Sequence, residues 1–159
     1  MKGDLNCVVN GKARSVVVAL NRTLAEFLRD DLNLRGCRVA CDGAVCGACT
    51  VLLDGKPVAS CSTFAFEADG AHVETIESLS SGPLSLHPIQ QAFLETNAFQ
   101  CGFCTAGLVM SVKALLAAHP SPDDKTIAEW LRSNVCRCTG YKTILEATRL
   151  AAARLKEHA

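Results

Sequence analysis

The chain has 159 residues, which is enough for one ordinary domain or two small ones. Its 16 basic and 16 acidic residues cancel, so it lacks the basic stripe that marks a nucleic-acid-binding protein. Apolar residues make up 49% of the chain, yet no stretch approaches the roughly 20 apolar residues of a membrane span.

The first 32 residues predict a hairpin followed by a short helix. Apolar runs over residues 5–9 and 15–20 flank Asn10-Gly11, which is a strong signal for a two-residue hairpin turn. Thr23 then predicts a helix cap. The apolar residues after it share one helical face: Leu24, Phe27, Leu28 and Leu32.

A second hairpin is expected after a loop at residues 36–49 that is rich in glycine, alanine and cysteine. Residues 50–53 predict a strand, Asp54-Gly55 a turn, and residues 57–61 the returning strand. A last strand is expected over residues 71–76. The first half is therefore predicted to be a small mixed β domain.

The composition changes near residue 78, where serine, glycine and proline predict a linker before a helical half. Four helical patterns follow, over residues 88–97, 102–119, 121–133 and 143–157. Ser121 is the expected cap of the third helix, with proline and two acidic residues after it. The prediction is an α+β chain with three parts: a β-rich domain at 1–78, a linker at 79–84 and a four-helix bundle at 85–159.

Ten cysteines in 159 residues are the outstanding feature of the composition. The polar start at residues 1–6 carries no apolar signal core, so a cytoplasmic location is expected. In a reducing compartment such a density of cysteines rarely means disulfides and indicates metal or redox chemistry.

The first set of cysteines has the spacing C-x4-C-x2-C, with a fourth cysteine after a gap of eleven residues. This is the plant-type [2Fe–2S] arrangement. Its predicted ligands are Cys41, Cys46, Cys49 and Cys61. Three thiolates would converge from one loop, which the glycines allow to turn sharply, and the fourth would arrive on the returning strand.

The second set is a C-x2-C pair, a gap of 31 residues and a C-x-C pair. Its predicted ligands are Cys101, Cys104, Cys136 and Cys138. Both pairs fall where helices are expected to begin, and helix N-termini stabilise thiolates and anionic clusters. A four-cysteine zinc site is the alternative, although a C-x-C pair is less usual there.

Two cysteines fall outside both sets. Cys7 is expected to be a buried apolar side chain in the first strand. Cys37 precedes Cys41 by four residues, and its use as a ligand would break the plant-type spacing. The four histidines are scattered without ligand spacing, which argues against a Rieske-type centre. Trp130 is expected to pack in the core or at an interface, while Tyr141 could pack or contact a partner.

Three segments together resemble the small iron–sulfur subunit of the xanthine oxidase family of molybdenum hydroxylases. They are Cys-Asp-Gly-Ala-Val-Cys-Gly-Ala-Cys-Thr-Val at 41–51, Gln-Cys-Gly-Phe-Cys-Thr at 100–105 and Asn-Val-Cys-Arg-Cys-Thr-Gly-Tyr at 134–141. Carbon monoxide dehydrogenase, 4-hydroxybenzoyl-CoA reductase and quinoline oxidoreductase have separate small subunits of this kind. The resemblance covers nearly the whole chain and departs at Ala40, Ala106 and Ser133, none of which is a cysteine.

The resemblance implies a plant-type ferredoxin domain of β-grasp fold, a helical [2Fe–2S] domain and a non-catalytic role in an oxidoreductase. It also implies a large subunit that binds molybdopterin, with a cytosine nucleotide in bacterial members, and a medium subunit that binds FAD. Gln100 and Cys138 match residues that contact the pterin. Electrons would pass from molybdenum through the helical-domain cluster and the plant-type cluster to FAD or an external acceptor.

Two other functions remain open from the sequence alone. A free ferredoxin-like shuttle would explain the first half, but it has no use for a second cluster domain. A zinc-binding scaffold would also use four-cysteine sites. The predicted function is therefore an electron-transfer subunit of a heteromeric molybdenum hydroxylase, with no catalytic residue on this chain.

Overall fold

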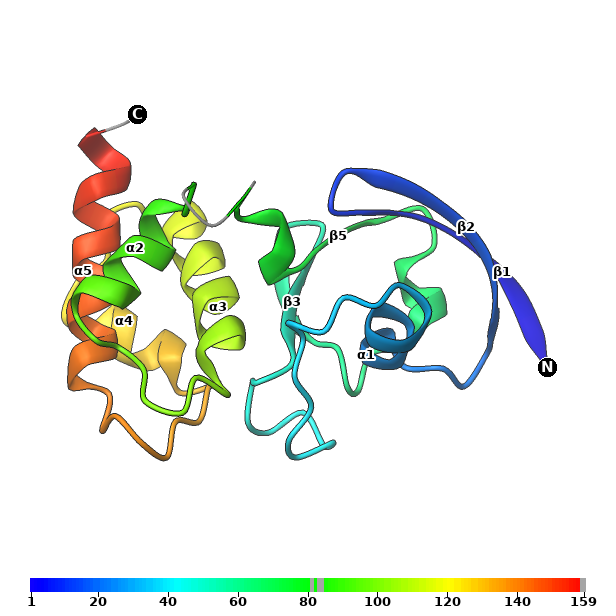
Figure 1. Cartoon of the computed structure of the whole chain (residues 1–159), viewed down its shortest axis with the longest axis horizontal. Helices are drawn as coiled ribbons and strands as arrows, with labels where there is room; N and C mark the ends of the chain where they lie inside the picture. The colour runs from blue at the N-terminus through cyan, green and yellow to red at the C-terminus, as the bar shows by residue number, and fades with distance from the viewer. Residues whose placement is uncertain (81, 83–84, 158–159) are drawn as a thin grey trace.

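The computed structural model describes residues 1–80, 82 and 85–157. The chain forms two halves that lie side by side, a β-sheet with short helices and a group of four longer helices (Figure 1). The α+β prediction is confirmed. Part of the predicted linker, at Ser81, Pro83 and Leu84, lies outside the described residues.

The sheet has five strands in the order β2-β1-β5-β3-β4. The strands are β1 (Lys2–Val9), β2 (Lys12–Ala19), β3 (Thr50–Leu53), β4 (Lys56–Ala59) and β5 (His72–Glu74). The strand β1 pairs antiparallel with β2 and parallel with β5, while β3 pairs antiparallel with both β4 and β5. The last strand thus lies at the centre of the sheet and joins two hairpins that are distant in sequence.

Both hairpins turn where the sequence predicts. Asn10 and Gly11 have φ of 50° and 75°, and Asp54 and Gly55 have φ of 48° and 77°. Two consecutive residues with positive φ match the twist of the flanking strands, which explains the preference for Asn-Gly and Asp-Gly. The strand β4 ends at Ala59, so the predicted return strand over residues 57–61 extends too far.

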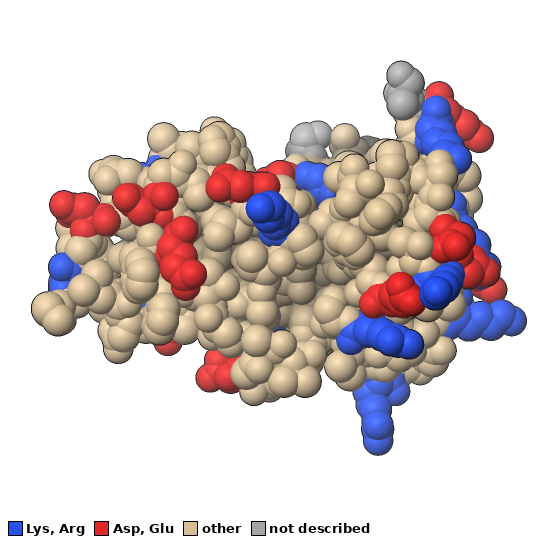
Figure 2. Space-filling view, turned by 180° about the vertical axis from the view of Figure 1, so that it is seen from behind, with Lys and Arg blue, Asp and Glu red and all other residues tan. Residues whose placement is uncertain are grey.

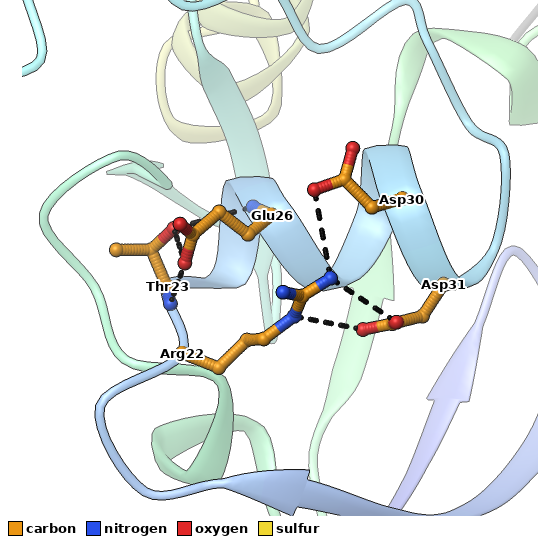
Figure 3. A network of polar contacts seen from close by, with 5 residues as sticks. All are labelled: Arg22, Thr23, Glu26, Asp30 and Asp31. Atoms are coloured by element: carbon orange, nitrogen blue, oxygen red, sulfur yellow. Dashed lines mark hydrogen bonds and ion pairs between the residues drawn. The ribbon is translucent and has the colours of Figure 1, made fainter.

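A short helix packs against the sheet after the first hairpin. The helix α1 (Leu24–Glu26) continues as a π-helical turn, η1 (Phe27–Asp31). Thr23 and Glu26 form the capping box, in which each side chain accepts a hydrogen bond from the other residue's N–H. Figure 3 shows this box beside Arg22, whose guanidinium reaches Asp30 and Asp31 and ties the start of α1 to the end of η1.

The second half consists of four helices: α2 (Pro88–Glu95), α3 (Thr105–Ala118), α4 (Asp124–Leu131) and α5 (Lys142–Glu157). The helix α3 is the most buried, because it lies between the other helices and the sheet. The cap of α4 is Asp123, whose carboxylate accepts the Thr126 N–H at 2.8 Å, so the predicted cap at Ser121 is wrong. Asp123 is the later of two competent capping residues, and the helix begins after it.

The two halves meet along α3 and β3. Lys113 on α3 forms an ion pair with Glu74 on β5. A Cβ added at Gly107 would lie only 2.2 Å from the Gly47 carbonyl oxygen, so the backbones touch where no side chain fits. The two halves are thus packed directly against each other.

Charges of both signs are spread over the face shown in Figure 2, with a broad uncharged band between the groups. This distribution agrees with the equal numbers of acidic and basic residues. In the part of the chain that the structure describes, no helix has the length and apolar character that crossing a membrane requires.

Candidate metal centres

The first two cysteines of the plant-type motif, Cys41 and Cys46, lie in a tight loop at residues 41–49, which is exposed over residues 41–45 and is drawn in cyan at the lower edge of Figure 1. Asp42, Ala44 and Gly47 have φ of 50°, 56° and 68°, and these left-handed residues curl the backbone around Cys41. The Cys46 N–H donates to Cys41 Sγ at 3.3 Å. This N–H, together with two more from the same loop, lowers the pKa of Cys41 to about 6.

The other two cysteines of this motif are buried. Cys49 is 2% exposed and Cys61 5% exposed. Burial is the main cause that raises the pKa of Cys49 to about 12, and the backbone of Cys61 opposes the shift. Cys61 lies in the turn after β4 and not on the strand, because the Ser62 N–H donates to the Ala59 oxygen and closes that turn.

The second set of cysteines lies at the same lower edge of the molecule. Cys104 caps α3, and Cys101 lies in the turn before it. Cys136 and Cys138 lie in the loop that leads to α5, drawn in orange in Figure 1. The Cys101 and Cys138 sulfur atoms are 3.6 Å apart, and the Cys136 thiol contributes to a raised pKa of Cys104.

The thiols of the second set differ in their environment. Burial raises the pKa of Cys104 to about 12, while the Phe103 N–H lowers the pKa of the exposed Cys101. Thr139 Oγ1 lies 3.2 Å from Cys136 Sγ. Backbone and hydroxyl groups around the sulfurs are contacts of the kind that tunes a metal site.

Tyr141 holds the loop that carries the C-x-C pair. Its hydroxyl accepts the Cys136 N–H at 2.9 Å and donates to the Asn134 oxygen at 3.0 Å. The sequence alone leaves the role of Tyr141 open between packing and contact with a partner. The structure gives it a structural role within the loop, which its spacing of five residues from Cys136 does not reveal.

Gln100 lies on the surface beside the second set, and its amide Nε2 donates to the Cys138 oxygen at 3.0 Å. The two residues predicted to contact a pterin therefore lie next to each other. They are 38 positions apart in sequence, and only the folding of the loops before α3 and α5 joins them.

The two cysteine sets are joined by direct contacts between their loops. The Val135 N–H donates to the Cys46 oxygen at 2.8 Å, and Asn134 Nδ2 donates to the Gly47 oxygen at 3.0 Å. Val135 is bonded to Cys136, so one hydrogen bond connects a cysteine residue of each set through the backbone. At Gly47 a Cβ would lie 2.4 Å from the Asn134 amide, which leaves room only for glycine.

Within the described residues the sulfur atoms are arranged in twos and do not converge in threes or fours on a single-ion site. In four pairs one thiol shifts the pKa of the other: Cys41 with Cys46, Cys49 with Cys61, Cys101 with Cys138, and Cys104 with Cys136. A [2Fe–2S] cluster has two irons, each with two protein ligands. The paired donor sets fit that group.

The remaining two cysteines are buried at 5% and 2% exposure and lie in the core of the first half. These are Cys7, as predicted, and Cys37, whose sulfur lies 3.0 Å from the Ser60 hydroxyl. The indole of Trp130 donates to the Ser111 oxygen at 3.1 Å, which confirms its predicted packing role.

Comparison with known proteins assigns both halves. Residues 7–79 match the family model of a 2Fe-2S iron-sulfur cluster binding domain, and residues 75–149 match that of a [2Fe-2S] binding domain. The nicotine 6-hydroxylase small subunit of Paenarthrobacter nicotinovorans is 50% identical over 144 residues, which span 91% of this chain and 86% of that subunit. The nicotinate dehydrogenase small FeS subunit of Eubacterium barkeri is 42% identical, over 96% of this chain and 97% of that subunit.

The chain belongs to the small iron–sulfur subunits of the xanthine oxidase family of molybdenum hydroxylases. This subunit superposes on a chain of quinoline 2-oxidoreductase from Pseudomonas putida 86 with a TM-score of 0.92, at 39% identity over 98% of its own length and 97% of that chain. It also matches 18% of the longer aldehyde oxidoreductase chain of Desulfovibrio gigas with a TM-score of 0.94, at 38% identity over 99% of its own length. The present chain is the electron-transfer subunit of a heteromeric oxidoreductase complex and carries two iron–sulfur domains.

Proposed function

We propose that the eight paired cysteines hold two [2Fe–2S] clusters. Cys41, Cys46, Cys49 and Cys61 would bind the plant-type cluster, and Cys101, Cys104, Cys136 and Cys138 the helical-domain cluster. The thiol pairs described above support this assignment, since each pair offers two ligands to one iron. The domain division at 1–78, 79–84 and 85–159 is proposed with it.

When bound, each cluster supplies a one-electron carrier whose potential depends on burial and on hydrogen bonds to sulfur. The observation that carries the proposal is the hydrogen bond from the Val135 N–H to the Cys46 oxygen. It joins the two ligand loops through their backbones, and the Asn134 amide holds them there. The chain's own residues thus hold the two carrier sites in a fixed position relative to each other.

The proposed electron route begins at a molybdopterin site in a large subunit, which we infer carries the cytosine nucleotide. It continues through the helical domain and the plant-type domain to FAD in a medium subunit or to an external acceptor. Gln100 and Cys138 would contact the pterin, and their position together on the exposed surface supports this. A cytoplasmic location is proposed because all ten cysteines are free thiols in the fold.

Co-expression with the partner subunits tests this proposal. The isolated complex should contain molybdenum and give two distinct [2Fe–2S] signals by electron paramagnetic resonance (EPR) after reduction. Cys136→Ser should remove or alter one signal and leave the other. Cys7→Ala is the matched control, because Cys7 is a buried cysteine outside both sets, and it should retain both signals.

Three outcomes would contradict the proposal. A stable monomer without a molybdenum-containing partner would favour a free ferredoxin-like shuttle. A colourless protein that contains zinc but no acid-labile sulfide would favour a zinc scaffold. Unchanged signals in the Cys136→Ser variant would refute the ligand role of Cys136.

A further inference from the structure

Behind the plant-type site lies a buried polar pair that the cysteine motif does not include. The Ser60 hydroxyl donates to the Cys49 carbonyl oxygen at 2.7 Å, and the Cys37 sulfur lies 3.0 Å from that hydroxyl. Ser60 is 0% exposed and Cys37 is 2% exposed. A thiol and a hydroxyl are thus enclosed in the core, directly against one of the proposed ligand residues.

The direction of these hydrogen bonds follows from the number of protons. A serine hydroxyl has one proton, and Ser60 commits it to the Cys49 oxygen. The Cys37 thiol in turn donates to the same Cys49 oxygen at 3.6 Å, and its sulfur lies 3.0 Å from the hydroxyl. The thiol and the hydroxyl thus both donate to one carbonyl oxygen, and we call this buried hydrogen-bond network the relay.

The relay is anchored at both ends by the first helical segment. Arg29 on η1 donates from Nη1 to the Cys37 oxygen at 2.7 Å, and the Ala25 N–H on α1 donates to the Ser60 oxygen at 2.9 Å. These contacts fix the Cys37 and Ser60 backbones independently of any bound group. The relay is therefore a rigid part of the β domain.

Both side chains therefore act on Cys49, whose carbonyl oxygen lies 2.7 Å from the Ser60 hydroxyl and 3.6 Å from the Cys37 sulfur. Each of these groups points its proton toward a residue that is proposed to bind the cluster. Hydrogen-bond donors held close to a cluster stabilise its reduced, more negative state and so raise its potential. We propose that Cys37 and Ser60 are positioning residues that hold the Cys49 carbonyl in place and raise the potential of the plant-type cluster.

The inference rests on the proposed cluster assignment and is tested on the cluster-loaded complex by redox titration monitored by EPR. Ser60→Ala should shift the midpoint of the plant-type signal to a more negative potential and leave the helical-domain signal in place. Cys37→Ala should shift it in the same direction by less, because the Ser60 donor remains. Cys37→Ser, which keeps a donor, should restore the wild-type midpoint.

Ser111→Ala is the matched control, because Ser111 is a buried serine on α3 and its side chain takes no part in the relay. Unchanged plant-type midpoints in both alanine variants would overturn the inference, as would equal shifts of both clusters. If the Ser60→Ala variant does not load the plant-type cluster, the midpoints of Cys37→Ala and Cys37→Ser alone test the inference. Absence of two signals in the wild type would instead refute the cluster assignment itself.

Discussion

Replacing Gly107 by alanine would place a methyl group in the contact between the two halves of the molecule. Its Cβ would lie 2.2 Å from the Gly47 oxygen and 2.9 Å from the Ala48 oxygen. Both are backbone atoms of the plant-type loop, so no side-chain rotation relieves the clash. The halves would have to separate at the point where the Val135 N–H meets the Cys46 oxygen.

The size of the effect follows from these distances. Restoring a 3.0 Å contact to the Gly47 oxygen requires a displacement of about 0.8 Å in a close-packed interface. Overpacking of this kind costs about 1–3 kcal/mol. For a chain of this length that corresponds to a fall of about 2–12 °C in the melting midpoint.

The assay is thermal unfolding of the cluster-loaded complex, followed by circular dichroism together with bleaching of the visible absorbance. Gly82→Ala is the control, since a Cβ there meets nothing within 4 Å. Gly107→Ala should melt earlier than both the wild type and the control, and electron transfer between the two clusters should slow. An unchanged midpoint with normal transfer would show that the halves are not held in this close contact.

Three further predictions concern the caps and the thiols. Asp123→Ala should cost about 1 kcal/mol of unfolding free energy through loss of the α4 cap, whereas Ser121→Ala should cost nothing in the same chemical denaturation assay. In the cluster-free protein, Cys41 should be the cysteine that alkylates fastest, because its thiolate form dominates above its lowered pKa. Its alkylation rate should rise as the pH increases through about 6. Peptide mass mapping would contradict this if Cys49 reacted equally fast at neutral pH. Tyr141→Phe should alter the helical-domain EPR signal alone, since the Cys136 N–H loses its acceptor.

The hairpins and most helices follow from local sequence because their determinants are local. Asn10-Gly11 and Asp54-Gly55 adopt positive φ more easily than most residue pairs, so both turns are predictable. The cap of α4 is harder to place, because Ser121 and Asp123 are both competent caps and the packing of the helix chooses between them. The end of β4 before Cys61 is not predictable from local sequence either, because strand ends depend on pairing partners.

The composition of the two four-cysteine sets is likewise a property of the sequence. The plant-type spacing is specific, and it separates Cys37 from the proposed ligands without any coordinates. How the eight thiols pair, which of them are buried and which backbone N–H groups face them could not be predicted. These properties arise from contacts such as that between Cys101 and Cys138, which are 37 residues apart.

By itself the sequence determined that this protein carries two different cysteine motifs on a β-rich and a helical half, because motif spacing and hydrophobic periodicity are encoded within short windows. Only the tertiary structure decided that a hydrogen bond from Val135 to Cys46 joins the two motif loops. It also decided that the Ser60 and Cys37 side chains meet at the Cys49 carbonyl. Both features depend on the close packing of segments that are far apart in the chain. No local pattern contains that information, because it is set by which surfaces fit together once the core has formed.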